Sequence, residues 1–120
     1  DDQRAVRRSL RRFFEKDGRF EVISEVEDGA EAITVAAREL PDVVVMDLAM
    51  PKVNGLEALP RIREAVPLAK IIVLSSMVHF DQTAAKAIAL GASAAFDKYT
   101  PPRKMIDALA KMFLKERRAS

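Results

Sequence analysis

Short apolar runs alternate with longer amphipathic stretches along this chain. Residues 43–46 are three valines and a methionine, and residues 71–74 are two isoleucines, a valine and a leucine. Runs of this length, rich in β-branched residues and bounded by proline or polar residues, are typical of strands rather than helices. A strand without a polar face is covered on both sides, as in a parallel sheet between helices. We therefore predict buried strands at both positions, the first of them ending in Asp47.

Amphipathic repeats predict the helices. Val6, Leu10 and Phe13 recur at helical spacing within residues 3–16, where arginines occupy much of the remaining surface. Similar apolar stripes lie at residues 33–40, 56–66, 81–90 and 105–113. Glycine or proline follows closely after most of these stretches, as expected where helices end.

The helix predicted at residues 56–66 contains two unusual residues. Pro60 lies within it, and an interior proline removes one helical hydrogen bond and clashes with the preceding turn, at a cost of about 3 kcal/mol. The helix is therefore expected to begin late or to kink near Pro60. Arg63 is the other exception, because it interrupts an otherwise apolar face.

Two weaker runs complete the pattern. Residues 20–26 are rich in β-forming residues and partly alternating, which predicts a strand that suits the edge of a sheet. Residues 94–97 predict a short strand that ends just before Lys98. Strand and helix then alternate from residue 20 onwards, so the predicted class is α/β with a parallel sheet.

Composition narrows the class of protein. The 120 residues suit a single domain over residues 1–120, and 20 Lys+Arg against 18 Asp+Glu leave a net charge of +2, too small to indicate nucleic-acid binding. The absence of cysteine fits a reducing compartment. No apolar run approaches the roughly 18–20 residues of a membrane span, and the N-terminus lacks the apolar core of a signal peptide. A soluble, cytoplasmic protein without a membrane partner is expected.

Polar residues follow three of the predicted strands. Asp47, Ser75 and Lys98 each stand at a strand end, and the carboxyl ends of parallel strands meet at the edge where α/β folds bind their ligands. Asp1 and Asp2 directly precede the first helix and join this edge if a strand comes before them. Together these groups indicate a site that handles an anion. Taken singly, each has a structural explanation as a helix cap, a strand-end turn or a surface lysine.

The chemistry of this set favours phosphoryl transfer. Clustered carboxylates raise the pKa of at least one of them unless a cation compensates, and Mg²⁺ is the natural candidate because it takes oxygen ligands. An aspartate beside Mg²⁺ can attack phosphorus and form an acyl phosphate. Lys98 would neutralise the phosphoryl oxygens, and the Ser75 hydroxyl would donate a hydrogen bond to one of them.

Several motifs occur in a fixed order along the chain. They are Asp1-Asp2, Met46-Asp47-Leu48-Ala49-Met50-Pro51, Asn54-Gly55-Leu56-Glu57, Val73-Leu74-Ser75-Ser76, Gly91-Ala92-Ser93 and Asp97-Lys98. In this order and spacing the chain resembles the receiver domain of two-component response regulators over essentially its whole length. The resemblance implies a flavodoxin-like (βα)₅ fold, a doubly wound parallel sheet with strand order 2-1-3-4-5.

The resemblance also implies roles for the strand-end residues. A sensor histidine kinase would transfer a phosphoryl group from phosphohistidine to Asp47, with Ser75 and Lys98 binding the transferred group. Mg²⁺ would be bound by Asp2, Asp47 and the Ala49 carbonyl, and Asp1 would help through water.

The chain departs from the family pattern at several positions. An apolar first strand is expected before the acidic pair, yet Asp1 is the first residue, so that strand is expected to be missing from the given residues. Ala95 stands where the family often has an aromatic residue, and Tyr99 stands where proline is common. Ala49 and Met77 occupy positions that tune phosphate hydrolysis, and neither can orient a water, which predicts slow self-dephosphorylation.

The predicted function is that of a signalling phosphoacceptor rather than an enzyme. Phosphorylation would switch the face formed by residues 75–113 and so control an output domain, a partner or a homodimer formed through residues 80–113. DNA would be contacted only by an output domain outside this chain. Two alternatives are an aspartate-dependent phosphatase and an unphosphorylated protein-interaction module. The haloacid-dehalogenase type of phosphatase requires a second aspartate where Ala49 stands.

Overall fold

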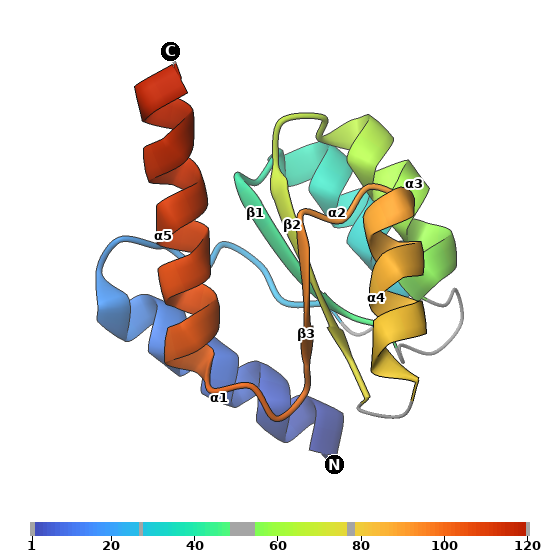
Figure 1. Ribbon diagram of the computed structural model, residues 1–120, viewed down its shortest axis with the longest axis horizontal. Helices are drawn as coiled ribbons and strands as arrows, with labels where there is room; N and C mark the ends of the chain where they lie inside the picture. Colours follow the sequence, from blue (N-terminus) through green and yellow to red (C-terminus); the bar gives the residue numbers. More distant parts are fainter. Residues whose placement is uncertain (1, 27, 49–54, 77–78, 120) are drawn as a thin grey trace. The chain divides into compact units, whose positions relative to one another are not determined.

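The computed structural model describes residues 2–26, 28–48, 55–76 and 79–119 (Figure 1). Five helices and three strands lie within these residues. In chain order they are α1 (Asp2–Asp17), α2 (Gly29–Glu39), β1 (Val43–Asp47), α3 (Gly55–Ala65), β2 (Lys70–Ser75), α4 (Phe80–Ala89), β3 (Ala94–Asp97) and α5 (Pro102–Ala119). The chain forms two compact units, one spanning Val26–Tyr99 and the other combining Asp1–Glu25 with Thr100–Ser120.

The unit spanning Val26–Tyr99 is built on a parallel sheet in the order β1-β2-β3, with β2 in the middle (Figure 1). The register sets Asp47 beside Leu74 and Ser75 beside Asp97. Every residue of β2 after Lys70 is buried, as predicted for a strand without a polar face. All three strands therefore direct their carboxyl ends to the same edge.

Helices α2, α3 and α4 lie together on one side of this sheet (Figure 1). Side chains alternate along a strand, so Ile71 and Val73 face the same side of β2, and both belong to one buried cluster with Met46. Leu59 and Ile62 of α3 are fully buried in that cluster, at 0% exposure each. Burial of an aliphatic side chain of this size contributes roughly 1.5–3 kcal/mol, so this layer supplies much of the stability that holds the sheet edge in place.

Arg63 is the polar residue on the buried face of α3, and the structure shows why it is tolerated. Its guanidinium donates to the backbone oxygens of Ala69 at 2.6 Å and Gly91 at 2.7 Å. It also donates to Val66 O at 3.3 Å and Pro67 O at 3.1 Å. A partly buried charge is tolerated when its hydrogen bonds are made. Arg63 thus ties the end of α3 to the turn after α4.

The second unit contains α1 and α5. Phe14 is buried at 7% exposure, and its ring meets that of Phe20 edge to face, with centroids 5.2 Å apart. Helix α1 ends at Asp17, where the Asp17 carboxylate accepts hydrogen bonds from Arg19 Nε at 2.7 Å and Arg19 Nη2 at 2.8 Å. The amphipathic repeats at both ends of the chain therefore form helices, as predicted.

The structure corrects one local prediction and excludes one of two alternatives in another. Residues 20–26 do not form a strand, because a strand requires a neighbour to share its ladder of hydrogen bonds, and β-rich composition alone does not supply one. The described residues form three strands in the order β1-β2-β3, and the full order 2-1-3-4-5 is not shown. Of the two expectations for the helix containing Pro60, the late start is excluded, since α3 starts at Gly55 and holds Pro60 in its interior. The kink near Pro60 stays a prediction.

Among the described residues, none of the helices is long and apolar enough to cross a membrane.

Candidate functional site

Asp47 is the last residue of β1 and lies at the carboxyl edge of the sheet. One further hydrogen bond to β2 follows Asp47, since Leu48 N–H donates to Leu74 O at 3.0 Å. The Asp47 side chain is 15% exposed, so its carboxylate is largely shielded and yet open to the surface. An apolar strand has thus delivered one acidic group to the edge where ligands bind in α/β folds.

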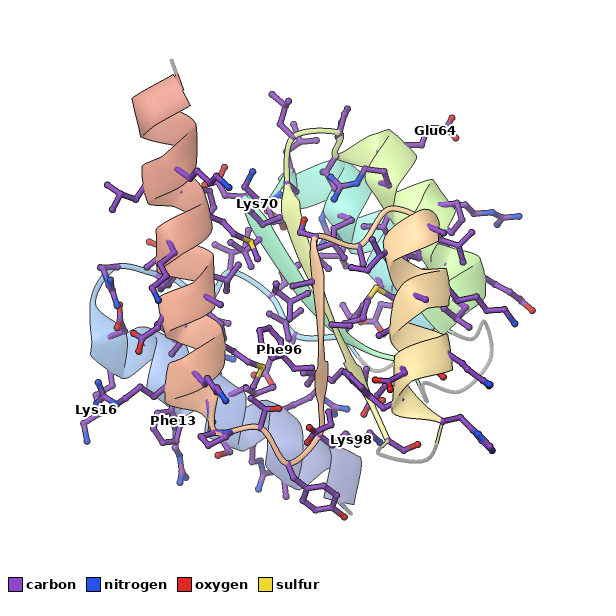
Figure 2. All side chains as sticks on the ribbon, in the orientation of Figure 1. Phe13, Lys16, Glu64, Lys70, Phe96 and Lys98 are labelled. Atoms are coloured by element: carbon purple, nitrogen blue, oxygen red, sulfur yellow. The ribbon has the colours of Figure 1, made fainter. Side chains whose placement is uncertain are left out.

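Lys98 reaches across the sheet from the end of β3 to this carboxylate. Its Nζ lies 3.2 Å from Asp47 Oδ2, and its side chain is 26% exposed. Figure 2 shows Lys98 at the opposite end of the sheet from Lys70, which begins β2. The structure therefore brings together Asp47 and Lys98, which are 51 positions apart in sequence (98 − 47).

Ser75 ends β2, the strand that lies between those carrying the charged pair. It is buried at 6% exposure, and its carbonyl accepts a hydrogen bond from Lys98 N–H at 2.9 Å. A carboxylate, a hydroxyl and an ammonium consequently end three adjacent strands at one edge. This arrangement can accept an anion, because the ammonium and the hydroxyl are both hydrogen-bond donors.

The structure describes only some of the predicted magnesium ligands. Asp1 and Ala49 lie outside the described residues, and Asp2 belongs to the other compact unit. Within the part of the chain that is described, no group of three or more histidine, cysteine, aspartate or glutamate side chains is placed to hold a metal ion. The ligand set for Mg²⁺ therefore stays a prediction, as does the role assigned to Met77, which also lies outside the described residues.

Ala95 occupies the position, three residues before Lys98, where the family often has an aromatic residue. Ala95 packs against the buried cluster beneath α2, α3 and α4. Phe96 is the next residue along β3 and therefore points to the opposite face of the sheet. The ring of Phe96 does not substitute for an aromatic side chain at Ala95.

Two further residues, Gly55 and Asp97, shape this edge, and neither was predicted as a site residue from the sequence. A Cβ atom on Gly55 would lie 2.6 Å from Leu48 Cα, so only glycine lets α3 begin this close to the residue after Asp47. The Asp97 carboxylate accepts a hydrogen bond from Tyr99 N–H at 2.9 Å, directly around Lys98. In the sequence, Gly55 was marked by its place in the Asn54-Gly55 motif and Asp97 by its place in the Asp97-Lys98 motif.

A parallel α/β sheet that brings an aspartate, a serine and a lysine together at its carboxyl edge fits the flavodoxin-like class of folds. The profile of the response regulator receiver domain matches residues 1–110. The chain belongs to this family, the receiver domains of two-component response regulators. The predicted flavodoxin-like α/β class is confirmed, and the described residues show three strands of its parallel sheet.

Individual relatives agree with this assignment. The chain is 36% identical to the chemotaxis protein CheY of Thermotoga maritima over 112 residues, which cover 93% of this chain and 92% of the relative. The receiver domain of AraT, a response regulator from Geobacillus stearothermophilus, is 31% identical with a TM-score of 0.84, covering 99% of this chain and 92% of that one. CheY in the CheX-CheY-BeF3-Mg²⁺ complex of Borrelia burgdorferi is 27% identical with a TM-score of 0.84, covering 94% of this chain and 84% of that one.

Other relatives are longer proteins. The matches to three proteins named as transcriptional regulators span 36%, 49% and 34% of their lengths. The chain therefore corresponds to between about a third and a half of those regulators.

Proposed function

We propose that this chain accepts a phosphoryl group on Asp47 from the phosphohistidine of a sensor histidine kinase. The observation that carries the proposal is the pair between Lys98 Nζ and Asp47 Oδ2, 3.2 Å apart at the carboxyl edge of the sheet. Family membership supports it, because receiver domains are signalling phosphoacceptors.

The transfer exchanges one bond to phosphorus for another. A carboxylate oxygen of Asp47 attacks phosphorus, the phosphorus–nitrogen bond of phosphohistidine breaks, and the electron pair returns to the imidazole. Lys98 then pairs with a phosphoryl oxygen in place of the carboxylate, and the Ser75 hydroxyl donates to another. The product carries roughly −1.5 to −2 charges, which gives the ammonium a stronger partner than the carboxylate alone.

The donor atoms at this edge suit a magnesium ion. Asp47 supplies a carboxylate that is partly open to the surface, and Mg²⁺ prefers such oxygen ligands. Asp2, the Ala49 carbonyl and, through water, Asp1 complete the proposed set. When bound, the ion would offset negative charge on the phosphoryl group during transfer. The relative from Borrelia burgdorferi was solved as a complex with Mg²⁺ and BeF3, which supports the same choice for this chain.

Phosphorylation is proposed to act as a switch. Ser75 and the chain after it would move toward the new charge, and the surface of residues 75–113 would repack, exposing a partner or homodimer surface within residues 80–113. Such a shift requires only that the phosphoryl group interact differently with the two states. Because Ala49 and Met77 cannot orient a water, the phosphorylated state is expected to hydrolyse slowly. The transcriptional-regulator relatives support an output domain that contacts DNA, outside this chain.

The test is phosphorylation by acetyl phosphate with Mg²⁺, followed by intact-mass measurement. The wild type should gain the mass of one phosphoryl group, and Asp47→Asn should gain none. Asp42→Asn is the matched control, since Asp42 is an exposed aspartate before the opposite end of the same strand, and this variant should react like the wild type. Chelation of Mg²⁺ should abolish the gain in the wild type and in Asp42→Asn.

Other outcomes separate the competing functions. Release of phosphate from acetyl phosphate without a protein adduct would support a phosphatase that uses Asp47. No adduct and no phosphate release would support a protein-interaction module. Either result contradicts the proposal.

A further inference from the structure

The backbone around Lys98 is held by two hydrogen bonds. Lys98 N–H donates to Ser75 O at 2.9 Å, and Tyr99 N–H donates to the Asp97 Oδ1 atom at 2.9 Å. The first bond fixes the peptide plane before the Lys98 Cα atom, and the second fixes the plane after it. Because peptide units are planar and only two torsions separate them, the direction in which the Lys98 side chain leaves the backbone is set by both bonds.

The second of these bonds depends on one side chain. Tyr99 is 81% exposed, so packing of its ring does not hold the turn. Asp97 is half-buried at the end of β3, where its neighbour across the ladder is Ser75. An aspartate is suited to this bond because its short carboxylate reaches the backbone N–H two residues further on. The Asp97 carboxylate is therefore the group that closes the turn from β3 into Tyr99.

We infer that Asp97 is a positioning residue for phosphoryl transfer, acting through Lys98. This inference rests on the proposed function of Asp47. The Lys98 stem must cross from β3 past β2 to bring Nζ within 3.2 Å of Asp47 Oδ2, so a rotation at its Cα is amplified along the side chain. With the turn closed by Asp97, the Lys98 side chain leaves the backbone in the direction that brings its ammonium to Asp47. Without that bond, the ammonium spends less time beside Asp47.

The substitutions at Asp97 separate hydrogen bonding from charge. Asp97→Asn keeps an oxygen acceptor at the same distance from the backbone and removes the charge. Asp97→Glu keeps the charge and moves the acceptor by one methylene, and Asp97→Ala removes both. If Asp97 acts by its bond to Tyr99, the asparagine variant should react like the wild type while the glutamate and alanine variants react more slowly. A role that depended on charge would give the reverse order for asparagine and glutamate.

The experiment measures the rate of adduct formation with acetyl phosphate and Mg²⁺. Loss of a hydrogen bond of ordinary strength predicts a rate about threefold to tenfold lower for Asp97→Ala. Asp42→Ala, at the opposite edge of the sheet, should leave the rate unchanged. If circular dichroism shows that Asp97→Ala does not fold, the comparison of asparagine with glutamate still decides, since both retain a polar side chain of similar size.

A double-mutant cycle with Lys98→Ala tests whether Asp97 acts through Lys98. In the Lys98→Ala background, Asp97→Ala should cause no further loss of rate, whereas an independent structural role would cause the same loss in both backgrounds. Additive losses, or a glutamate variant as fast as the wild type, would overturn the inference. Its failure is distinguishable from failure of the proposed function, in which the wild type itself forms no adduct.

Discussion

The pair of Asp47 and Lys98 shows how a single residue is placed for function. Both side chains are mostly shielded, at 15% and 26% exposure, so their attraction is less screened than that of a surface pair. The energy of such a pair is small on balance, because desolvation opposes the attraction. Its value lies in geometry, since the ammonium already stands where a phosphoryl group on Asp47 would need a cation.

Asp17 and Arg19 give a residue-scale prediction about acidity. The hydrogen bonds from Arg19, followed in importance by its charge, hold the pKa of the Asp17 carboxyl below its ordinary value. A depressed folded-state pKa means that the pair favours the folded state above the unfolded-state pKa, and that this contribution disappears as pH falls through the lower, folded-state value.

The measurement is a carbon NMR titration of the Asp17 carboxyl. Its midpoint should lie below that of an unstructured aspartate, and Arg19→Gln should return it toward the ordinary value. Arg38→Gln is a suitable control, because the Arg38 side chain pairs with Glu39 rather than with Asp17. A midpoint that does not move in Arg19→Gln would show that Arg19 is not the cause.

At the scale of elements, Arg63 joins segments that the strands alone would leave separate. Its guanidinium donates to the Gly91 carbonyl oxygen. Gly91 has a φ of +121°, and a Cβ atom added there would lie 3.1 Å from the Cβ and Cγ atoms of Arg63. Ser93 links the turn after α4 to the start of β2, since its hydroxyl accepts a hydrogen bond from Ile71 N–H at 3.0 Å. The end of α3, the start of β2 and the turn after α4 thus form one connected corner, at the sheet edge away from Asp47.

Replacing Arg63 should therefore weaken this corner. Arg63→Ala leaves several backbone oxygens without their donor, and a loss of about 2–4 kcal/mol in the free energy of unfolding is expected, since hydrogen bonds to charged groups are worth about 1.5–3 kcal/mol. Arg63→Lys should recover part of this, because a lysine cannot reproduce the planar fork. Denaturant unfolding is the measurement. The exposed Arg61 is the control, and Arg61→Ala should change stability by less than about 0.5 kcal/mol.

At the scale of the whole molecule, the proposed switch predicts which residues change their structure when Asp47 is phosphorylated. Residues within 75–113 should change their amide hydrogen exchange when Asp47 is phosphorylated, whereas α2 should not. A new surface within residues 80–113 should raise the sedimentation coefficient if it forms a homodimer. Exchange should be compared with and without acetyl phosphate, with Asp47→Asn as the control. Equal exchange in both states would contradict the switch.

Much of the fold and part of the site could be predicted from the sequence. The four residues before Asp47 and the four before Ser75 are all apolar, and a strand without a polar face favours a parallel sheet. In the structure β2 is buried after Lys70, whereas β1 is half-buried except at Met46. Parallel strands share an edge, so the residues at their ends could be grouped without knowing any distance. The strand at residues 20–26 was predicted wrongly because β propensity describes a preference, while a strand depends on a partner.

The remaining features depend on groups that a sequence does not display. The sequence showed Arg63 only as an arginine on an apolar face. Its hydrogen-bond partners could not be predicted, because they are backbone oxygens and every residue carries one. Asp97 was visible only as part of a motif, since its bond to Tyr99 N–H depends on how the turn is closed. The collision that excludes a side chain at Gly55 depends on the path of another segment.

By itself, the sequence determined that Asp47, Ser75 and Lys98 end strands of one parallel sheet, because hydrophobic periodicity is a local property of the chain. Only the tertiary structure decided that Lys98 Nζ meets Asp47 Oδ2 and that Lys98 N–H pairs with Ser75 O. Those contacts depend on register, on the order β1-β2-β3 and on torsions about single bonds. They are set when the chain packs, and local preference does not encode them.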